Sequence, residues 1–239
     1  MSAAGEVEMR QIAVLLRGEP ELLLQWIERW TARRLAMCVT VIILGAGLYG
    51  AAMGWWRAPR QALFVAIKFP LIILLTSAGN ALLNAMLAPL LGLNLTVRQS
   101  FLAVLMSFTI ASAILGSFSP LIAFMVWNAP PLAADVARSM GTYGFIQITH
   151  VLVIAFAGVT ANLRLGQLLR QFGGGASAAR RVLLAWLVGN FFLVSQLCWI
   201  LRPFIGSPGL PVEFLRKTAF HGNFYETVFQ SVAGLLTFE

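Results

Sequence analysis

Residues 60–92 read RQALFVAIKFPLIILLTSAGNALLNAMLAPLLG, and this stretch decides the fold class. Between Ala62 and Leu91 it holds thirty residues with a single charge, Lys68. A helix rises about 1.5 Å per residue, so a helix of this length exceeds the ~30 Å hydrocarbon core of a bilayer. The chain has four further apolar runs, which a soluble domain of 239 residues has no means of covering. The sequence therefore predicts an all-α, polytopic membrane helical bundle with about five transmembrane helices.

The composition agrees with a membrane protein. Apolar residues make up 59% of the chain and charged residues only 11%, whereas soluble proteins carry about 25% charged residues. The 17 basic residues outnumber the 9 acidic ones and stand mostly at the ends of the apolar runs, where they meet phospholipid headgroups. We therefore expect anionic lipid headgroups as partners and no nucleic acid. The dominance of Arg over Lys is typical of a GC-rich bacterial genome.

The apolar runs divide the chain into three parts. An N-terminal segment, 1–34, precedes a five-span membrane domain, 35–201, and a Pro/Gly-rich segment with an amphipathic helix, 202–239, follows it. The predicted spans are 35–56, 62–91, 97–118, 142–163 and 182–201, and the third opens with a capping box at Thr96 and Gln99. Residues 120–127 either extend the third span or re-enter the membrane. The glycine- and alanine-rich residues 173–179 predict a flexible hinge.

Small and polar residues recur at helical spacing inside the spans. Gly50 and Gly54 continue a small-residue ridge that permits close helix packing, and Asn80 and Asn84 share one helix face. Amides in lipid must find partners, so we expect these faces to turn toward other helices. The candidates for helix packing and a polar core are Gly50, Gly54, Asn80, Asn84, Gln147, His150 and Asn190. Lys68 is expected to snorkel to the interface instead.

One glycine pattern in the first span is also found in cofactor-binding proteins. Gly45, Gly47 and Gly50 fit the dinucleotide-binding pattern G-x-G-x-x-G, but the acidic residue expected about 20 positions later is missing and bilayer-length apolar sequence follows. Packing glycines are the better interpretation. The two histidines, His150 and His221, are too few for a zinc site, and no catalytic motif occurs. The sequence therefore predicts no catalytic residue, no metal and no cofactor.

Amphipathic segments flank the spans. A helix at 7–17 is followed by a second that places Trp26 and Trp30 on one face, close to Arg33 and Arg34. This pattern is typical of a helix in the headgroup region, and a helix on a partner protein is the alternative. A C-terminal helix after Asn223 has a similar character, with the Tyr225 hydroxyl expected to reach water. The candidates for a lipid or partner surface are Trp26, Trp30, Arg33, Arg34, Arg170, Arg180, Arg181, Tyr225 and Phe229.

Basic residues also set the expected orientation. With five spans, ten Lys and Arg residues lie on the side of the N-terminal segment and seven on the other side. The positive-inside rule therefore places the N-terminus in the cytoplasm of a bacterial inner membrane.

The pattern resembles the Yip-type family of five-span integral membrane proteins, including its bacterial members. The features that carry the resemblance are the N-terminal segment, five spans within 35–201, and Pro/Gly-interrupted second and third spans; residues 201–209, LRPFIGSPG, resemble a stretch of other bacterial multi-span proteins. The family's acidic cytoplasmic motif has no counterpart here, so a Rab-type GTPase partner is not implied. The resemblance implies a non-enzymatic role in organising a membrane or anchoring a complex of membrane or peripheral subunits, or a homo-oligomer. A passive channel or transporter along Asn80, Asn84, Gln147, His150 and Asn190 is the alternative.

Overall fold

The computed structural model describes the chain except residues 1–16, 18–19, 29–30, 133–135, 173–174 and 237–239. Its described residues form seven α-helices, one short 3₁₀ helix and no strand, so the predicted all-α class is confirmed. The helices are α2 (Pro20–Glu28), α3 (Ala32–Trp55), α4 (Pro59–Leu90), α5 (Val97–Asn128), α6 (Val136–Leu169), α7 (Gly175–Leu201) and α8 (Phe224–Leu236), with the 3₁₀ helix η1 at Arg170–Phe172.

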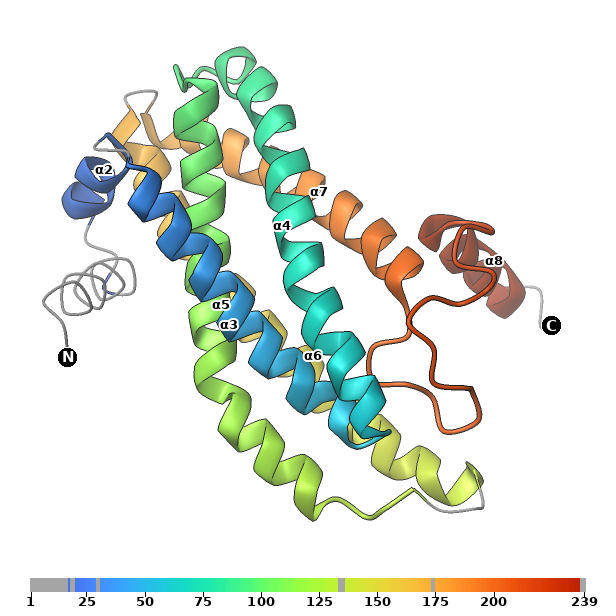
Figure 1. Ribbon diagram of the computed structural model, residues 1–239. Helices are drawn as coiled ribbons and strands as arrows, with labels where there is room; N and C mark the ends of the chain where they lie inside the picture. The colour runs from blue at the N-terminus through green and yellow to red at the C-terminus, as the bar shows by residue number, and fades with distance from the viewer. Residues whose placement is uncertain (1–16, 18–19, 29–30, 133–135, 173–174, 237–239) are drawn as a thin grey trace, which may run out of the picture.

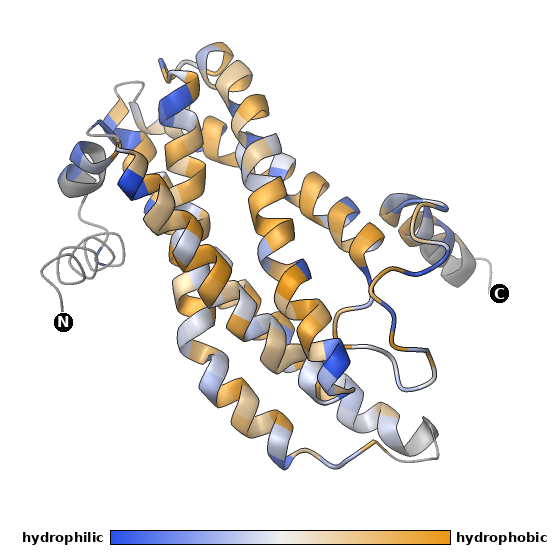
Figure 2. Cartoon of the chain, in the orientation of Figure 1, coloured by the Kyte–Doolittle hydropathy of each residue, from blue (hydrophilic) through white to orange (hydrophobic). Residues whose placement is uncertain are grey.

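Five helices, α3 to α7, are long and apolar enough to cross a membrane. Consecutive helices run in opposite directions, so the bundle has two ends (Figure 1). Apolar residues cover the middle of the bundle, and polar residues gather toward the helix ends and the connecting segments (Figure 2). Large apolar side chains such as Leu82, Trp127 and Val188 are exposed on its sides. Such a surface is stable against acyl chains and not against water, and the chain is an integral membrane protein.

The third span is a single helix. α5 continues through Pro120 to Asn128, so residues 120–127 extend this span and do not re-enter. A proline removes one backbone hydrogen bond and bends a helix, but α5 is held by its neighbours: Leu115, Ser119, Ile122 and Val126, on either side of Pro120, are buried. The predicted capping box is present at its start. The Thr96 hydroxyl accepts from the Gln99 amide at 3.2 Å, and the Gln99 side chain accepts from the Thr96 amide at 3.0 Å.

The predicted hinge before the fifth span is wrong in most of its length. α7 already begins at Gly175, and residues 176–179 are helical. Ala178 and Ala179 are buried in the hydrophobic core of the bundle. Alanine is the strongest helix former, and burial of this first turn adds to that preference, so the segment continues as helix.

α3 lies between α4 and α5, with direct backbone contact on both sides. Toward α4, a Cβ atom at Gly50 would lie 2.6 Å from the Val65 carbonyl oxygen, and Gly54 meets α4 in the same way one turn later. Toward α5, a Cβ atom at Gly116 would lie 2.8 Å from the Cα of Gly45. Glycine is therefore required at these positions, because no side chain fits between the helices.

α7 lies at the edge of the bundle and leans on α4 (Figure 1). Its buried residues are Ala178, Ala179, Val182 and Trp186 near its start and Leu201 at its end, so the rest of the helix is at least partly exposed. After Leu201 the chain leaves the helix and returns as an irregular segment toward the N-terminal part of α4 before it enters α8 (Figure 1). α8 begins with the predicted cap: the Asn223 side chain accepts from the Glu226 amide at 2.8 Å.

Candidate functional site

Lys68 does not snorkel to the interface, contrary to the expectation from its position. Its side chain is 0% exposed, and its ammonium nitrogen donates to the Pro203 carbonyl oxygen at 3.0 Å. Aromatic rings surround the charge: Nζ lies 5.0 Å from the ring centroid of Phe214 and 6.0 Å from those of Phe64 and Phe204. The segment after α7 covers this part of α4, so a carbonyl and ring faces replace the headgroups that Lys68 was expected to reach.

Gln61 lies about two helical turns nearer the start of α4 and supports the same segment. Its side-chain nitrogen donates to the Pro203 carbonyl oxygen at 3.1 Å and to the Phe204 carbonyl oxygen at 2.5 Å. Non-helical backbone at the depth of a membrane is stable only where its polar groups find partners within the protein. Gln61 and Lys68 therefore allow the segment after α7 to sit against the bundle.

His150, a predicted polar-core residue, pairs with Tyr49 of α3. The Tyr49 hydroxyl lies 2.9 Å from His150 Nδ1, and the two rings meet edge to face with centroids 5.4 Å apart. His150 is 2% exposed, and its other nitrogen, Nε2, has no partner among the described residues. Gln147, one turn earlier on α6, is exposed.

A cavity of about 360 Å³ lies beside this pair, between α6 and the segment after α7. Gln147 and His150 line it, but Asn80, Asn84 and Asn190 do not. Among the described residues, its wall contains two arginines and no Asp or Glu. The full lining is Met53, Phe69, Tyr143, Gln147, His150, Val151, Ile154, Cys198, Arg202, Pro203, Phe204, Ile205, Gly206, Ser207 and Arg216. We call it the arginine cavity.

The two arginines bring positive charge into a partly desolvated place. The Arg202 guanidinium stacks 3.4 Å from the Trp199 ring centroid and donates to the Trp199 carbonyl oxygen at 2.7 Å, while its Nε has no partner among the described residues. Burial lowers the pKa of the Arg202 guanidinium from its ordinary value, and the positive charge of Arg216 lowers it further. An anion in the cavity would relieve both effects.

The asparagines form a separate polar site between α4 and α7. The Asn80 side-chain amide donates to the side-chain oxygen of Asn190. Asn84 is also buried, and neither of its amide atoms has a partner among the described residues. The five polar residues proposed as one path therefore do not share one site: Asn80 pairs with Asn190, whereas Gln147 and His150 line a cavity that none of the three asparagines lines.

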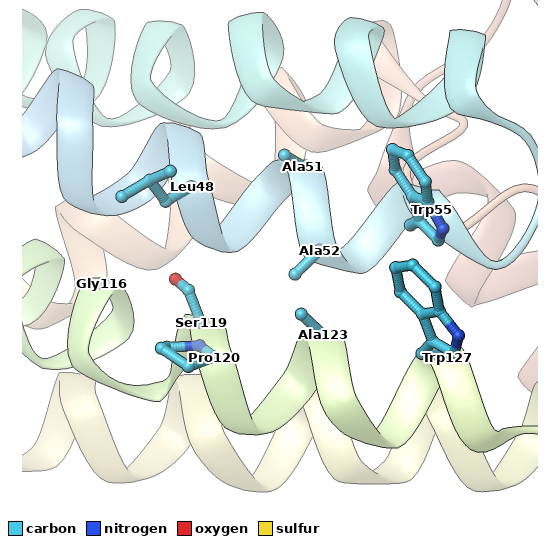
Figure 3. Close-up of a pocket in the computed structure, with 9 residues that line it drawn as sticks. All are labelled: Leu48, Ala51, Ala52, Trp55, Gly116, Ser119, Pro120, Ala123 and Trp127. Atoms are coloured by element: carbon cyan, nitrogen blue, oxygen red, sulfur yellow. The ribbon is translucent and has the colours of Figure 1, made fainter.

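An apolar groove opens between α3 and α5, on the side where the helices diverge beyond their contact at Gly45 and Gly116. Its volume is about 410 Å³. Figure 3 shows small side chains such as Ala51 and Ala123 in the middle and Trp55 and Trp127 side by side at one end. The lining is Leu48, Ala51, Ala52, Trp55, Gly116, Ser119, Pro120, Ala123 and Trp127, which we call the α3–α5 groove.

The N-terminal surface candidates lie partly within the bundle. Trp26 of α2 is buried in the core cluster together with Ile27, so this face of α2 packs on its own chain and not on headgroups. Arg34 holds it there, donating to the Trp26 carbonyl oxygen at 2.7 Å with its guanidinium 5.7 Å from the Trp26 ring. Arg33 is exposed, whereas Trp30 and the predicted helix at 7–17 fall outside the described residues, apart from Arg17.

The remaining surface candidates lie at opposite ends of the molecule. Arg170, Arg180 and Arg181 are exposed around the connection between α6 and α7, and Arg181 donates to the Leu91 carbonyl oxygen at 3.3 Å. Phe229 of α8 is exposed. The Tyr225 hydroxyl donates to the Phe192 carbonyl oxygen at 3.0 Å at an exposed position, and the two ring centroids are stacked 4.8 Å apart.

Sequence reasoning did not assign Tyr49, Gln61, Arg202 or Arg216 to any site. Tyr49 and Gln61 carry a sequence signal, since each is a polar group near the end of a predicted span and requires a partner in lipid. In the sequence, Arg202 and Arg216 contribute only to the Lys and Arg count that predicts the orientation in the membrane. Their convergence depends on the path of an irregular segment, which no periodicity reports.

Comparison of the chain with protein-family models, with curated proteins and with solved structures found no match.

Proposed function

We propose that the chain is a non-enzymatic structural subunit of a bacterial inner membrane, which anchors a membrane complex by receiving a transmembrane helix of a partner subunit. The observation that supports this role is the α3–α5 groove, which lies along the apolar part of the bundle and is open on its side. In this proposal the N-terminus lies in the cytoplasm, and exposed Arg170, Arg180 and Arg181 face the cytoplasmic leaflet.

The shape of the groove favours a helix as its occupant. Its wall on α5 is made by Gly116, Ser119, Pro120, Ala123 and Trp127, which share one face of the helix. Small residues let the backbone of a second helix approach closely, and van der Waals packing at such places drives helix association in lipid. Trp55 and Trp127 stand at one end, as aromatic side chains do at membrane interfaces.

The experiment is purification of the full chain from its native membrane in a mild detergent, followed by mass measurement of the intact complexes. We expect a complex heavier than one chain. Ala123→Phe fills the groove and should reduce the recovered complex by about tenfold, since forcing a larger side chain into a close contact costs about 1–3 kcal/mol. Ala155→Phe is the matched control, because Ala155 is an exposed alanine of α6 that does not line the groove.

Three outcomes of this experiment distinguish the proposal from its alternatives. A lone monomer from the native membrane would contradict a subunit role. A complex that Ala123→Phe leaves intact would remove the groove from the proposal, and a complex that contains only this chain would identify the partner as a second copy.

A further inference from the structure

The arginine cavity combines an anion-attracting end with an apolar end. Along α6 its wall extends from Tyr143 to Ile154, which is about 16 Å of helix at 1.5 Å per residue. The segment after α7 contributes Arg202, Ser207 and Arg216 to the lining. This segment bonds to Arg57 and Gln61, and the Tyr143 ring lies against Trp56, so both belong to the end of the bundle where α3 meets α4, which we call the outer end. A ligand that fills the cavity would therefore meet different chemistry along its length.

The outer end of the cavity favours a negatively charged ligand. Arg202 and Arg216 both line it, no Asp or Glu of the described chain does, and the Arg202 Nε lacks a partner there. Guanidinium groups bind phosphate through paired, charge-assisted hydrogen bonds. Two arginines that repel one another at this place are stabilised when an anion enters between them.

His150 supplies an independent observation deeper in the cavity. It lines the wall, is 2% exposed, and its Nε2 has no partner among the described residues. Among the described residues the Tyr49 hydroxyl has one partner, His150 Nδ1, and a buried hydroxyl group donates its hydrogen. We therefore assign Nδ1 as the acceptor, which leaves Nε2 as an N–H donor for the ligand.

The apolar end is open to the side of the bundle. Val151 and Ile154 line the cavity and are exposed, Val151 by 59%. Both lie within the stretch of α6, Ser139–Phe172, that is long and apolar enough to cross a membrane, so we infer that the opening faces acyl chains. A small soluble anion would fill only the outer end.

We propose that the arginine cavity binds one anionic phospholipid, with its phosphate at Arg202 and Arg216 and an acyl chain against Val151 and Ile154. His150 Nε2–H donates to an ester or phosphate oxygen between these two ends. This site goes beyond the proposed subunit role and does not depend on it, because it is separate from the α3–α5 groove. It also lies at the opposite end of the bundle from the basic connection between α6 and α7 (Figure 1).

The test uses the full chain, delipidated in detergent and titrated with dioleoyl phosphatidylglycerol, while retained lipid is counted by native mass spectrometry. Dioleoyl phosphatidylcholine is the zwitterionic comparison and sodium phosphate the free-anion competitor. We expect tight retention of one phosphatidylglycerol, weakened about tenfold in Arg216→Gln, because the variant loses a charged hydrogen-bond donor to the phosphate. Lys217→Gln is the matched control: it removes the same charge from the exposed neighbouring residue.

A second pair of variants tests the apolar end without touching charge. Val151→Trp fills the cavity wall, whereas Leu152→Trp, at a neighbouring residue with 65% exposure, does not enter it. Lipid retention should fall for Val151→Trp alone. Equal retention of phosphatidylcholine, equal retention by both members of each pair, or displacement of the lipid by millimolar sodium phosphate would overturn the proposal, the last by identifying the site as one for a free anion.

Discussion

The Lys68 ammonium nitrogen lies 3.0 Å from the carbonyl oxygen of Pro203, a residue 135 positions later in the chain. This contact joins the second span to the segment after the fifth. The charge is completely buried, and three aromatic rings lie within 6.0 Å of it. A hydrogen bond and ring faces thus replace the aqueous interface as the environment of a charge in the membrane.

Labelling of lysine tests this environment directly, because the chain has only two lysines, Lys68 and Lys217. Lys217 is exposed and Lys68 is not. A water-soluble amine reagent should modify Lys217 at least about tenfold faster, since a buried group reacts only through local opening. Peptide mass spectrometry of protein in membranes gives the two rates. If Lys68 and Lys217 are modified at comparable rates, Lys68 is accessible to water, and its side chain reaches the interface.

The pair Asn80 and Asn190 is expected to hold α7 against α4. Asn190→Leu leaves the Asn80 amide unpaired in a medium of low polarity and should lower the free energy of unfolding by about 1–2 kcal/mol. The double variant Asn80→Leu/Asn190→Leu should lose less than the sum of the two single losses, because no amide is then left without its partner. Unfolding titrations in mild detergent measure the cycle. Additive losses would show that the two side chains do not interact.

The backbone contact between α3 and α5 gives a prediction with an internal control. A Cβ atom at Gly45 would lie 2.2 Å from the Ser112 carbonyl oxygen, so Gly45→Ala must push the helices apart and should cost about 1–3 kcal/mol. Gly158 has nothing within 4 Å of such an atom. Gly158→Ala should therefore be neutral or stabilise by up to about 1 kcal/mol through helix propensity. Circular dichroism during thermal unfolding compares the two, and equal effects would contradict the close contact.

Hydropathy and local signals predict the elements of this fold, but not their partners. The length of each apolar run gives five spans, and Thr96 with Gln99 marks the start of α5, because these are properties of neighbouring residues. The sequence does not decide whether the third span continues beyond Pro120, since a proline bends or ends a helix according to what packs on it. The structure shows that packing is sufficient there, with α5 the most buried of the five spans.

The candidate site was harder to predict for the same reason. Spacing places Asn80 on an inward face, but it does not reveal that Asn190 lies opposite. Lys68 was expected to snorkel because its distance from the helix end is the only local guide. Its true partner is supplied by an irregular segment more than a hundred residues later. Arg202 and Arg216 converge through that same segment, so their shared cavity is a property of tertiary structure alone.

The expected topology has its own test. If five helices cross the membrane and the more basic end faces the cytoplasm, a reporter fused after Glu239 should be active on the external side. Paired fusions of alkaline phosphatase and a cytoplasmic fluorescent protein measure the side. Cytoplasmic activity at this position would contradict either the count of spans or the orientation.

Tyr225 makes the main contacts that hold α8 against α7. Tyr225 stacks on the Phe192 ring and donates to the Phe192 carbonyl oxygen, and the Phe224 amide donates to the Gln196 side chain at 3.3 Å. Tyr225→Ala removes the stacking and the hydroxyl together, a loss of about 1–3 kcal/mol. We expect faster amide hydrogen exchange in residues 224–236, with α3 to α5 unchanged, because local opening of a peripheral element does not require global unfolding.

Phe229→Ala is the control on the same helix. Its ring is 73% exposed, so its removal should leave exchange in α8 near the wild-type rate. Tyr225→Phe separates the two contributions, since it retains the stacked ring and loses only the hydrogen bond, and it should fall between wild type and Tyr225→Ala. If Phe229→Ala releases α8 as strongly as Tyr225→Ala, the helix is held by its apolar surface against lipid, and α7 is not its anchor.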